Sequence, residues 1–308
     1  AMTNWFVRKR GLALGIRWAF SGVLVLPLIT WLISNQGWRA ACVIGGVVML
    51  VVGWTLTWFF VRQHRPEHYG LLPDGARIDD ADGADAGQLI DRGVEYAADF
   101  HEIEFTLRQA MRTPAYWLML AGLAMHGTAL TSLLTHLIPL LTDMGIDPTA
   151  AAAMTMIAGM TSIASRFGTG VLADRVGKSS LRMIMVAAYA LQAGGIALFA
   201  TNPTESVIYP FLILFYVGMG ATMILTSILG GRYFGRKAFG SIRGSTAIIS
   251  MPIAMLGPVY AGWVYDSTGG YIPALTLFAW LLGAAAVLMF FARPPKAPRQ
   301  ITGISDIV

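Results

Sequence analysis

Charged residues and cysteine are scarce in this chain. Only 13% of its 308 residues are charged, against about 25% in a typical soluble domain. The single cysteine, Cys42, excludes a disulfide within the chain. By contrast, 56% of the residues are hydrophobic and the mean hydropathy is +0.61. These values argue against a soluble globular protein and predict a membrane protein.

The groups needed for catalysis or metal binding are also missing. The sequence has no Walker loop, no Ser/His/Asp set and no cluster of metal ligands. His126 and His136 are ten residues apart and have no Asp or Glu nearby, so they do not suggest a metal site. We therefore predict no enzyme, no catalytic residue, no metal and no cofactor. Although the pI is near 9.5, the basic residues form short clusters between apolar runs, so no nucleic acid is expected as a partner.

Long apolar stretches dominate the remaining sequence. A helix needs about 20 mostly apolar residues to cross a bilayer. Eight stretches meet this requirement, so we predict an all-α, polytopic membrane helix bundle with eight transmembrane helices. They cover residues 11–33, 40–61, 115–141, 149–171, 181–200, 206–231, 244–265 and 272–292.

The basic residues are distributed unevenly between the two sets of alternate loops. Of the 22 Lys and Arg residues, 19 fall in one set or in the two tails, whereas the other set contains only Arg39. Cytoplasmic loops carry such an excess of positive charge. The pattern predicts a multi-pass protein of the cytoplasmic (inner) membrane, with both termini of this chain in the cytoplasm.

Residues 63–113 differ in composition from the rest of the chain. They contain 11 of the 17 acidic residues, which predicts a solvated cytoplasmic linker. The end of this linker, Phe105–Arg112, is amphipathic and is expected to lie along the membrane surface. The predicted domains are a partial N-terminal half with two helices (1–62), the acidic linker (63–113), a six-helix C-terminal half (114–293) and a cytoplasmic tail (294–308).

An internal repeat relates the first helix pair to the last. Trp5–Gly11 and Tyr233–Gly240 both open a helix with an aromatic and basic run, and the outer turns at Gly37–Ala41 and Gly270–Ala274 also match. Four helices precede the second copy and none precedes the first. Halves of equal size would imply a twelve-helix protein of which this chain is an N-terminal truncation. Chance similarity between basic helix starts is the alternative.

One loop carries a specific motif. The run Gly170-Val-Leu-Ala-Asp-Arg-Val-Gly-Lys178 follows the second helix of the six-helix half. It resembles G-x-x-x-D-R-x-G-[RK], the signature loop of the major facilitator superfamily, whose two parallel six-helix repeats are joined by a cytoplasmic linker. The resemblance implies that this loop latches the gating helix bundles and does not contact substrate. Its residues are Gly170, Asp174, Arg175, Gly177 and Lys178.

Each residue type in this motif has a physical reason. Gly170 and Gly177 are expected to permit close approach and a tight turn. Asp174 is expected to accept hydrogen bonds from the helix N-terminus near Gly244.

Three further segments narrow the resemblance. Trp5–Ile16, His136–Gly145 and Gly257–Asp266 look like the oxalate/formate antiporter and monocarboxylate-transporter-like branch. This implies secondary active transport, as a symporter or antiporter, by alternating access. Carboxylate carriers of the family place cations deep in the second and fifth helices of the C-terminal half. Here those helices offer only Arg166 near the cytoplasmic end and Arg243 at the mouth, which argues against an oxalate-like substrate.

Polar and charged side chains at membrane depth are the candidates for substrate contact. Arg17, six residues into the first stretch, either attracts an anion or extends to the interface. His126, near the bilayer middle, either contacts substrate or a proton, or is hydrogen-bonded between packed helices. Tyr216 is a third candidate. Hydroxyl groups that are candidates for a cavity wall are those of Thr155, Thr161, Ser162, Thr222, Thr226, Ser245, Thr246 and Ser250.

The leading hypothesis is a secondary carrier of a small solute, such as an organic anion of the monocarboxylate kind. Its expected partners are the lipid bilayer, the substrate and a coupling proton or counter-anion, and the carrier is expected to be a monomer. Three alternatives stay open. A membrane-embedded enzyme would need paired His or acidic residues in the membrane, a channel would need a selectivity filter, and a fragment of a carrier would transport nothing.

Overall fold

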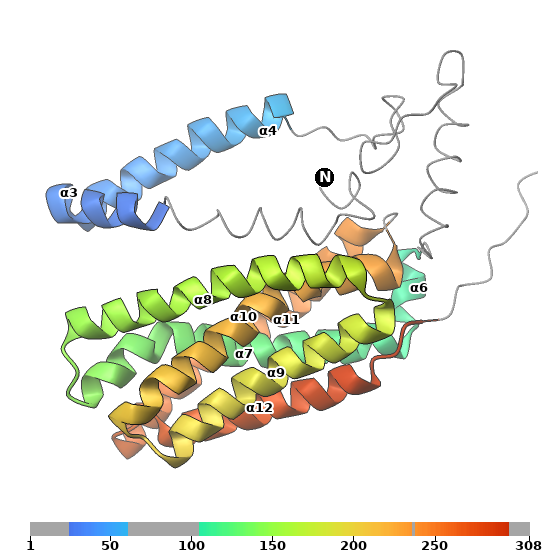
Figure 1. The fold of residues 1–308 in the computed structure, drawn as a ribbon. Coiled ribbons are helices and arrows are strands. Elements are labelled where there is room, and N and C mark those ends of the chain that lie inside the picture. The colour runs from blue at the N-terminus through green and yellow to red at the C-terminus, as the bar shows by residue number, and fades with distance from the viewer. Residues whose placement is uncertain (1–24, 61–104, 236–237, 296–308) are drawn as a thin grey trace, which may run out of the picture. The chain divides into compact units, whose positions relative to one another are not determined.

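A computed structural model describes residues 25–60, 105–235 and 238–295, and every regular element in these ranges is a helix (Figure 1). This confirms the predicted all-α class for the described residues. The chain divides into two compact units, residues 1–101 with 166–174 and residues 102–165 with 175–308. We refer to the second unit as the bundle.

The first unit contains two helical stretches on either side of a kink at Gly37. Its elements are α3 (Val25–Val48), the π-helix η1 (Met49–Gly53) and α4 (Trp54–Phe60). Gly37 interrupts α3 with a φ of 80°, a backbone conformation that favours glycine, and it lies in the predicted outer turn. Large apolar side chains such as Trp54 and Trp58 are exposed. Most of the first predicted helix, including Arg17, lies outside the described residues.

The bundle contains one short helix, five long ones and most of α8, whose residues 166–174 belong to the first unit. They are α6 (Leu107–Met111), α7 (Pro114–Asp143), α8 (Pro148–Arg175), α9 (Lys178–Thr201), α10 (Glu205–Phe234), α11 (Phe239–Thr268) and α12 (Ile272–Phe291). The six long helices match the six predicted for residues 114–293 to within a few residues at each end. The local sequence explains where two of these helices begin. Helix α7 begins with a proline after the capping residue Thr113, and α8 begins with a proline after the capping residue Asp147.

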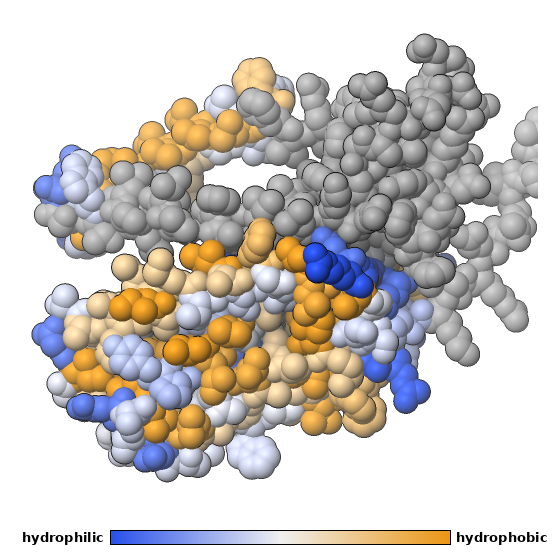
Figure 2. Space-filling view, in the orientation of Figure 1, coloured by the Kyte–Doolittle hydropathy of each residue, from blue (hydrophilic) through white to orange (hydrophobic). Residues whose placement is uncertain are grey.

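Six described segments are long and apolar enough to cross a membrane. They are Asn35–Phe59 and the helices α7, α9, α10, α11 and α12. Helix α8 has 28 residues but is rich in Ala, Gly, Ser and Thr and is less apolar. The count of eight transmembrane helices therefore stays a prediction. Figure 2 shows apolar side chains over the visible middle of the bundle and hydrophilic ones toward its two ends.

Helix α10 forms the core of the bundle, and glycine allows its neighbours to approach closely. A Cβ atom on Gly218 would lie 2.6 Å from Ala188 O in α9, and one on Gly220 would overlap Ser162 O in α8. Ser165 Oγ also donates a 2.6 Å hydrogen bond from α8 to Val217 O. Small residues at helix contacts are the usual basis of packing in membranes, where no hydrophobic effect drives helices together.

Hydroxyl groups join α7 to α11. Pro258 has no N–H, so the carbonyl of Ala254 loses its usual helical partner. Thr131 Oγ1 lies 2.8 Å from this carbonyl and donates to it. Ser132 Oγ donates to Gly257 O at 3.2 Å, and Thr128 Oγ1 lies 3.3 Å from Ile253 O and 3.0 Å from Ala124 O of its own helix. The polar character of this stretch is thus largely explained by packing.

The short helix α6 lies against one end of the bundle, which we call the α6 end. Phe105 is buried, its N–H donates to Phe234 O at 3.0 Å, and the two rings meet edge to face with centroids 5.7 Å apart. A capping box between Thr106 and Gln109 starts the helix, and Ala110 is fully buried. The described part of the amphipathic segment therefore packs its apolar side chains on protein.

Candidate functional site

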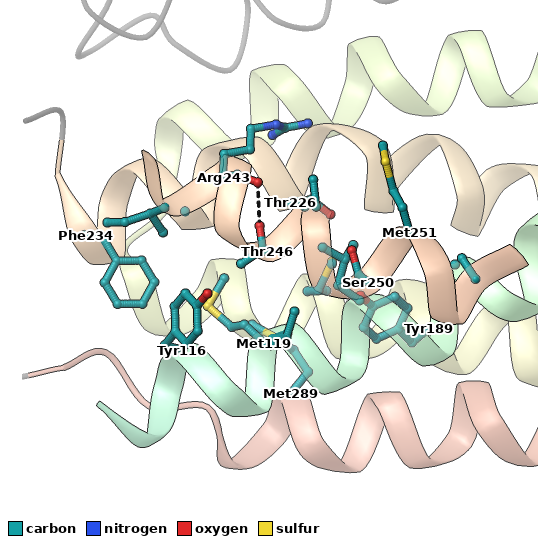
Figure 3. A pocket seen from close by; sticks show the side chains of 18 of the residues that line it. Tyr116, Met119, Tyr189, Thr226, Phe234, Arg243, Thr246, Ser250, Met251 and Met289 are labelled. Atoms are coloured by element: carbon teal, nitrogen blue, oxygen red, sulfur yellow. Dashed lines mark hydrogen bonds between the residues drawn. The ribbon is translucent and has the colours of Figure 1, made fainter. Parts of the chain in front are cut away.

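A cavity of about 360 Å³ lies within the bundle between α7, α9, α10, α11 and α12 (Figure 3). It is nearer the α6 end, where α10 ends and α11 begins. The residues that line it are Tyr116, Met119, Leu120, Leu123, Gly127, Thr131, Met185, Tyr189, Thr226, Gly230, Phe234, Ile242, Arg243, Thr246, Ala247, Ser250, Met251, Ala254 and Met289. This described lining contains no acidic residue, so its formal charge is that of Arg243.

Arg243 reaches from α11 toward α10. Its Nη1 atom donates a 2.7 Å hydrogen bond to Ser227 Oγ, and Ser227 follows Thr226 in the cavity wall. One turn later, Thr246 Oγ1 donates to Arg243 O at 2.9 Å (Figure 3). The guanidinium of this exposed residue thus contributes N–H groups to one side of the cavity.

Two further hydroxyl groups belong to the cavity wall. Tyr189 on α9 is 1% exposed and Ser250 on α11 is 7% exposed, and both line the cavity. Neither hydroxyl hydrogen-bonds to another described residue. Both side chains reach the cavity surface, so their hydroxyls can bond to a ligand or to water there.

His126 lies outside the cavity lining. Its Nε2 atom is 3.2 Å from Gln192 Oε1 in α9 and 3.3 Å from Thr222 Oγ1 in α10. Its ring centroid is 5.2 Å from that of Tyr189, whose ring does line the cavity. Of the two roles considered for His126, its contacts in the described structure are those of a histidine hydrogen-bonded between packed helices.

The other two candidates also lie away from the cavity lining or cannot be placed. Tyr216 on α10 is buried, with its ring edge against Phe215, and it does not line the cavity. Arg17 lies outside the described residues. Their roles in substrate binding stay predictions.

The signature loop connects α8 to α9. Gly170 and Asp174 are in α8, Arg175 ends that helix, and Gly177 and Lys178 start α9. Gly177 has a φ of −75°, and no atom in the described structure lies within 4 Å of a Cβ built on it. The role of this glycine in a close approach stays a prediction.

The loop is instead held to α10 by a side chain that sequence reasoning did not single out. Arg232 Nη1 donates a 2.6 Å hydrogen bond to Val176 O, in the middle of the motif. The bond predicted between Asp174 and the helix start near Gly244 stays a prediction.

Sequence reasoning found part of the cavity wall. Thr226, Thr246 and Ser250 were candidates and line it, whereas Thr155, Thr161 and Ser162 bond to carbonyls of their own helix. Tyr189 was missed, because one tyrosine in an apolar helix carries no signal of its own. Arg243 was noted only at the mouth of its helix.

The apolar helices surround a cavity whose described wall includes one cationic residue, Arg243. This arrangement is that of a multi-pass membrane protein that can admit a small solute. The chain belongs to the Major Facilitator Superfamily, which it matches over residues 1–254.

Its relatives are named as transporters. The protein named "Probable sulfoacetate transporter SauU" from Cupriavidus necator is 25% identical over 310 residues, which cover 96% of this chain and 67% of the relative. Monocarboxylate transporter 12-B from Danio rerio is 25% identical over 299 residues, 93% of this chain and 61% of the relative. Monocarboxylate transporter 13 from Rattus norvegicus is 23% identical over 308 residues, which cover 94% of this chain and 61% of the relative. The chain thus spans between 61% and 67% of the length of these relatives.

Proposed function

We propose that the protein is a secondary carrier of a small organic anion. The observation that carries this proposal is the position of Arg243, a cationic side chain in the wall of a largely apolar cavity whose described lining has no acidic residue. Its side chain is exposed near the start of α11, where it can meet an anion that enters the cavity. The names of the relatives, which refer to sulfoacetate and monocarboxylates, support an anion with a carboxylate or sulfonate group.

The cavity suits transient binding of such an anion. An anion that enters it loses hydration, and the guanidinium repays part of this cost through charge-assisted hydrogen bonds. The bond between Arg243 and Ser227 can hold the guanidinium in place when no anion is bound. Release requires that the site be weak enough to empty when it opens to the other side.

Alternating access would then move this anion across the membrane. We propose that the helices of 1–62 and the six-helix half at 114–293 rock about a central site, joined by the cytoplasmic linker at 63–113. The loop Gly170–Lys178 would latch the cytoplasmic side, with the tail at 294–308 also cytoplasmic. The proposed location is the cytoplasmic membrane, the proposed state is a monomer, and a proton or counter-anion would supply the coupling.

Counterflow in proteoliposomes tests the proposal. Vesicles loaded with unlabelled acetate, lactate, sulfoacetate or 3-phenylpropanoate are diluted into the same labelled anion. We expect saturable, protein-dependent uptake of at least one anion that is stimulated by internal anion. Arg243→Gln should lower this uptake by about tenfold or more, whereas Arg293→Gln, an exposed arginine after α12, should not. Folded protein that accumulates none of these anions above protein-free vesicles would overturn the proposal.

A further inference from the structure

We infer that the cavity selects an anion with a carboxylate at one end, a hydrogen-bonding group at the other and an apolar body between them. This inference deepens the proposed function and rests on it for the role of Arg243. It narrows the substrate to elongated hydroxy acids, such as those with a 4-hydroxyphenyl group.

The spacing of polar groups along α11 sets the length of the ligand. Arg243 and Ser250 are seven residues apart, which is close to two helical turns and about 10 Å along the axis. Residues seven apart lie on the same face of a helix, and both of these line the cavity. The arginine side chain covers part of this backbone spacing, and an anion that contacts both side chains must bridge the rest along the apolar wall.

A second helix strengthens the distal hydrogen-bonding position. Tyr189 on α9 is 1% exposed, lines the same cavity as Ser250 and makes no hydrogen bond through its hydroxyl to another described residue. Its ring contacts that of His126, with centroids 5.2 Å apart. Two buried hydroxyls on different helices can each donate or accept a hydrogen bond, so together they suit a ligand hydroxyl or carbonyl.

The wall between these polar positions is apolar and adaptable. It includes four methionines, Met119, Met185, Met251 and Met289, and Figure 3 shows Met119 and Met289 between Tyr116 and Tyr189. Methionine side chains are flexible and make favourable contacts with aromatic rings. The volume of about 360 Å³ exceeds the ~150 Å³ of a cavity that accepts benzene. A phenyl ring with a short acidic chain therefore fits.

The same features disfavour other anions. A small hydrophilic anion would leave the apolar wall and both distal hydroxyls without contacts. A dicarboxylate would place its second charge among methionines, because Arg243 is the charged residue of the described lining. Burial of an unpaired carboxylate is strongly unfavourable.

Binding to the purified chain in detergent, measured by titration calorimetry, tests this inference without requiring transport. The probe is 3-(4-hydroxyphenyl)propanoate. The comparison ligands are 3-phenylpropanoate, which lacks the hydroxyl, propanoate, which lacks the ring, and 3-(4-hydroxyphenyl)propanamide, which lacks the charge. We expect loss of the ring to weaken binding by about 10- to 100-fold and loss of the hydroxyl by about 2- to 12-fold.

Variants of the lining residues test which side chains contact each end of the ligand. Tyr189→Phe and Ser250→Ala should weaken binding of the hydroxylated acid by about 2- to 12-fold and leave 3-phenylpropanoate unaffected. Arg243→Gln should weaken both acids and leave the amide unaffected. Tyr209→Phe is the matched control, because this tyrosine is exposed on α10 away from the cavity.

The outcomes separate this inference from the proposed function. If small anions are carried in counterflow but the hydroxylated acid binds no more tightly than propanoate, the inference is wrong and the carrier proposal stands. If the acid binds tightly but Tyr189→Phe and Ser250→Ala both leave the effect of its hydroxyl unchanged, the assigned distal site is wrong. If no anion in either panel binds or is carried, both proposals fail.

Discussion

Thr131 Oγ1 lies 2.8 Å from the carbonyl oxygen of Ala254, four residues before Pro258. Proline provides no N–H for that carbonyl, so a hydroxyl of α7 takes the place of the missing helical donor in α11. The proline and the threonine thus form one structural unit, although more than a hundred residues separate them. Because Thr131 and Ala254 also line the cavity, this contact helps to define its wall.

Thr131→Val should destabilise the bundle by about 0.6–1.7 kcal/mol, the range found for hydrogen bonds between membrane helices. Valine keeps the shape but removes the donor, leaving Ala254 O unpaired. Thr135→Val is the control, because Thr135 Oγ1 bonds to Thr131 O of its own helix. Unfolding in detergent with increasing SDS measures both. Equal stability of the two variants would show that the contact contributes nothing.

Gly257→Ala should destabilise the protein more than any hydroxyl deletion on this helix pair. A Cβ on Gly257 would overlap Thr128 O, so α7 and α11 would have to separate. We expect a cost of about 1–3 kcal/mol from overpacking. Gly262→Ala on the same helix is the matched control, since its Cβ would meet His136 Cε1 at 3.9 Å, an ordinary contact. The idea is refuted if the melting temperatures of the two variants fall equally.

His126→Ala should lower stability and leave the apparent KM unchanged for an anion as short as acetate, which does not depend on Tyr189. The substitution leaves Gln192 and Thr222 without a partner across the helices and opens space beside Tyr189. We expect a loss of about 1–3 kcal/mol. The measurements are SDS unfolding and counterflow normalised to folded protein. A large rise in KM at unchanged stability would instead restore His126 as a substrate contact.

Arg232→Gln should slow transport and leave anion binding unchanged. Its Nη1 holds the carbonyl of Val176 in the signature loop, outside the cavity, so the variant disturbs the proposed latch. We expect the maximal counterflow rate to fall by about 5- to 10-fold, a loss on the scale of a charge-assisted hydrogen bond. Calorimetric affinity should not change, and Arg108→Gln, exposed on α6, should show neither effect. A normal rate for Arg232→Gln would rule out a role for this contact in transport.

The helices of the bundle could be predicted because a membrane imposes a simple rule. Backbone polar groups have no water to bond, so an apolar run of sufficient length must form a helix. The apolar runs predicted the starts of α7 and α8 to within a residue, and the structure adds the local reason, a capping residue followed by Pro114 or Pro148. Helix α8 itself shows the limit of hydropathy, since its small residues make it the least apolar of the six.

The candidate site could be predicted only in part, because hydropathy gives the depth of a residue and says little about which way it faces. His126 and Tyr216 lie at suitable depths but are packed outside the cavity lining, whereas Tyr189 was not singled out and faces the cavity.

By itself, the sequence determined the class of this protein: a multi-pass helical membrane protein of the major facilitator type, with a signature loop at a set place in its helix order. These properties depend on the length of the apolar runs, the charge of the loops and a local motif, all of which are visible in the order of residues along the chain. The tertiary structure decided which side chains share the cavity. That outcome depends on close approaches such as Gly220 to Ser162 and Gly257 to Thr128, which fix the rotation of each helix against its neighbours and are not legible in any one helix alone.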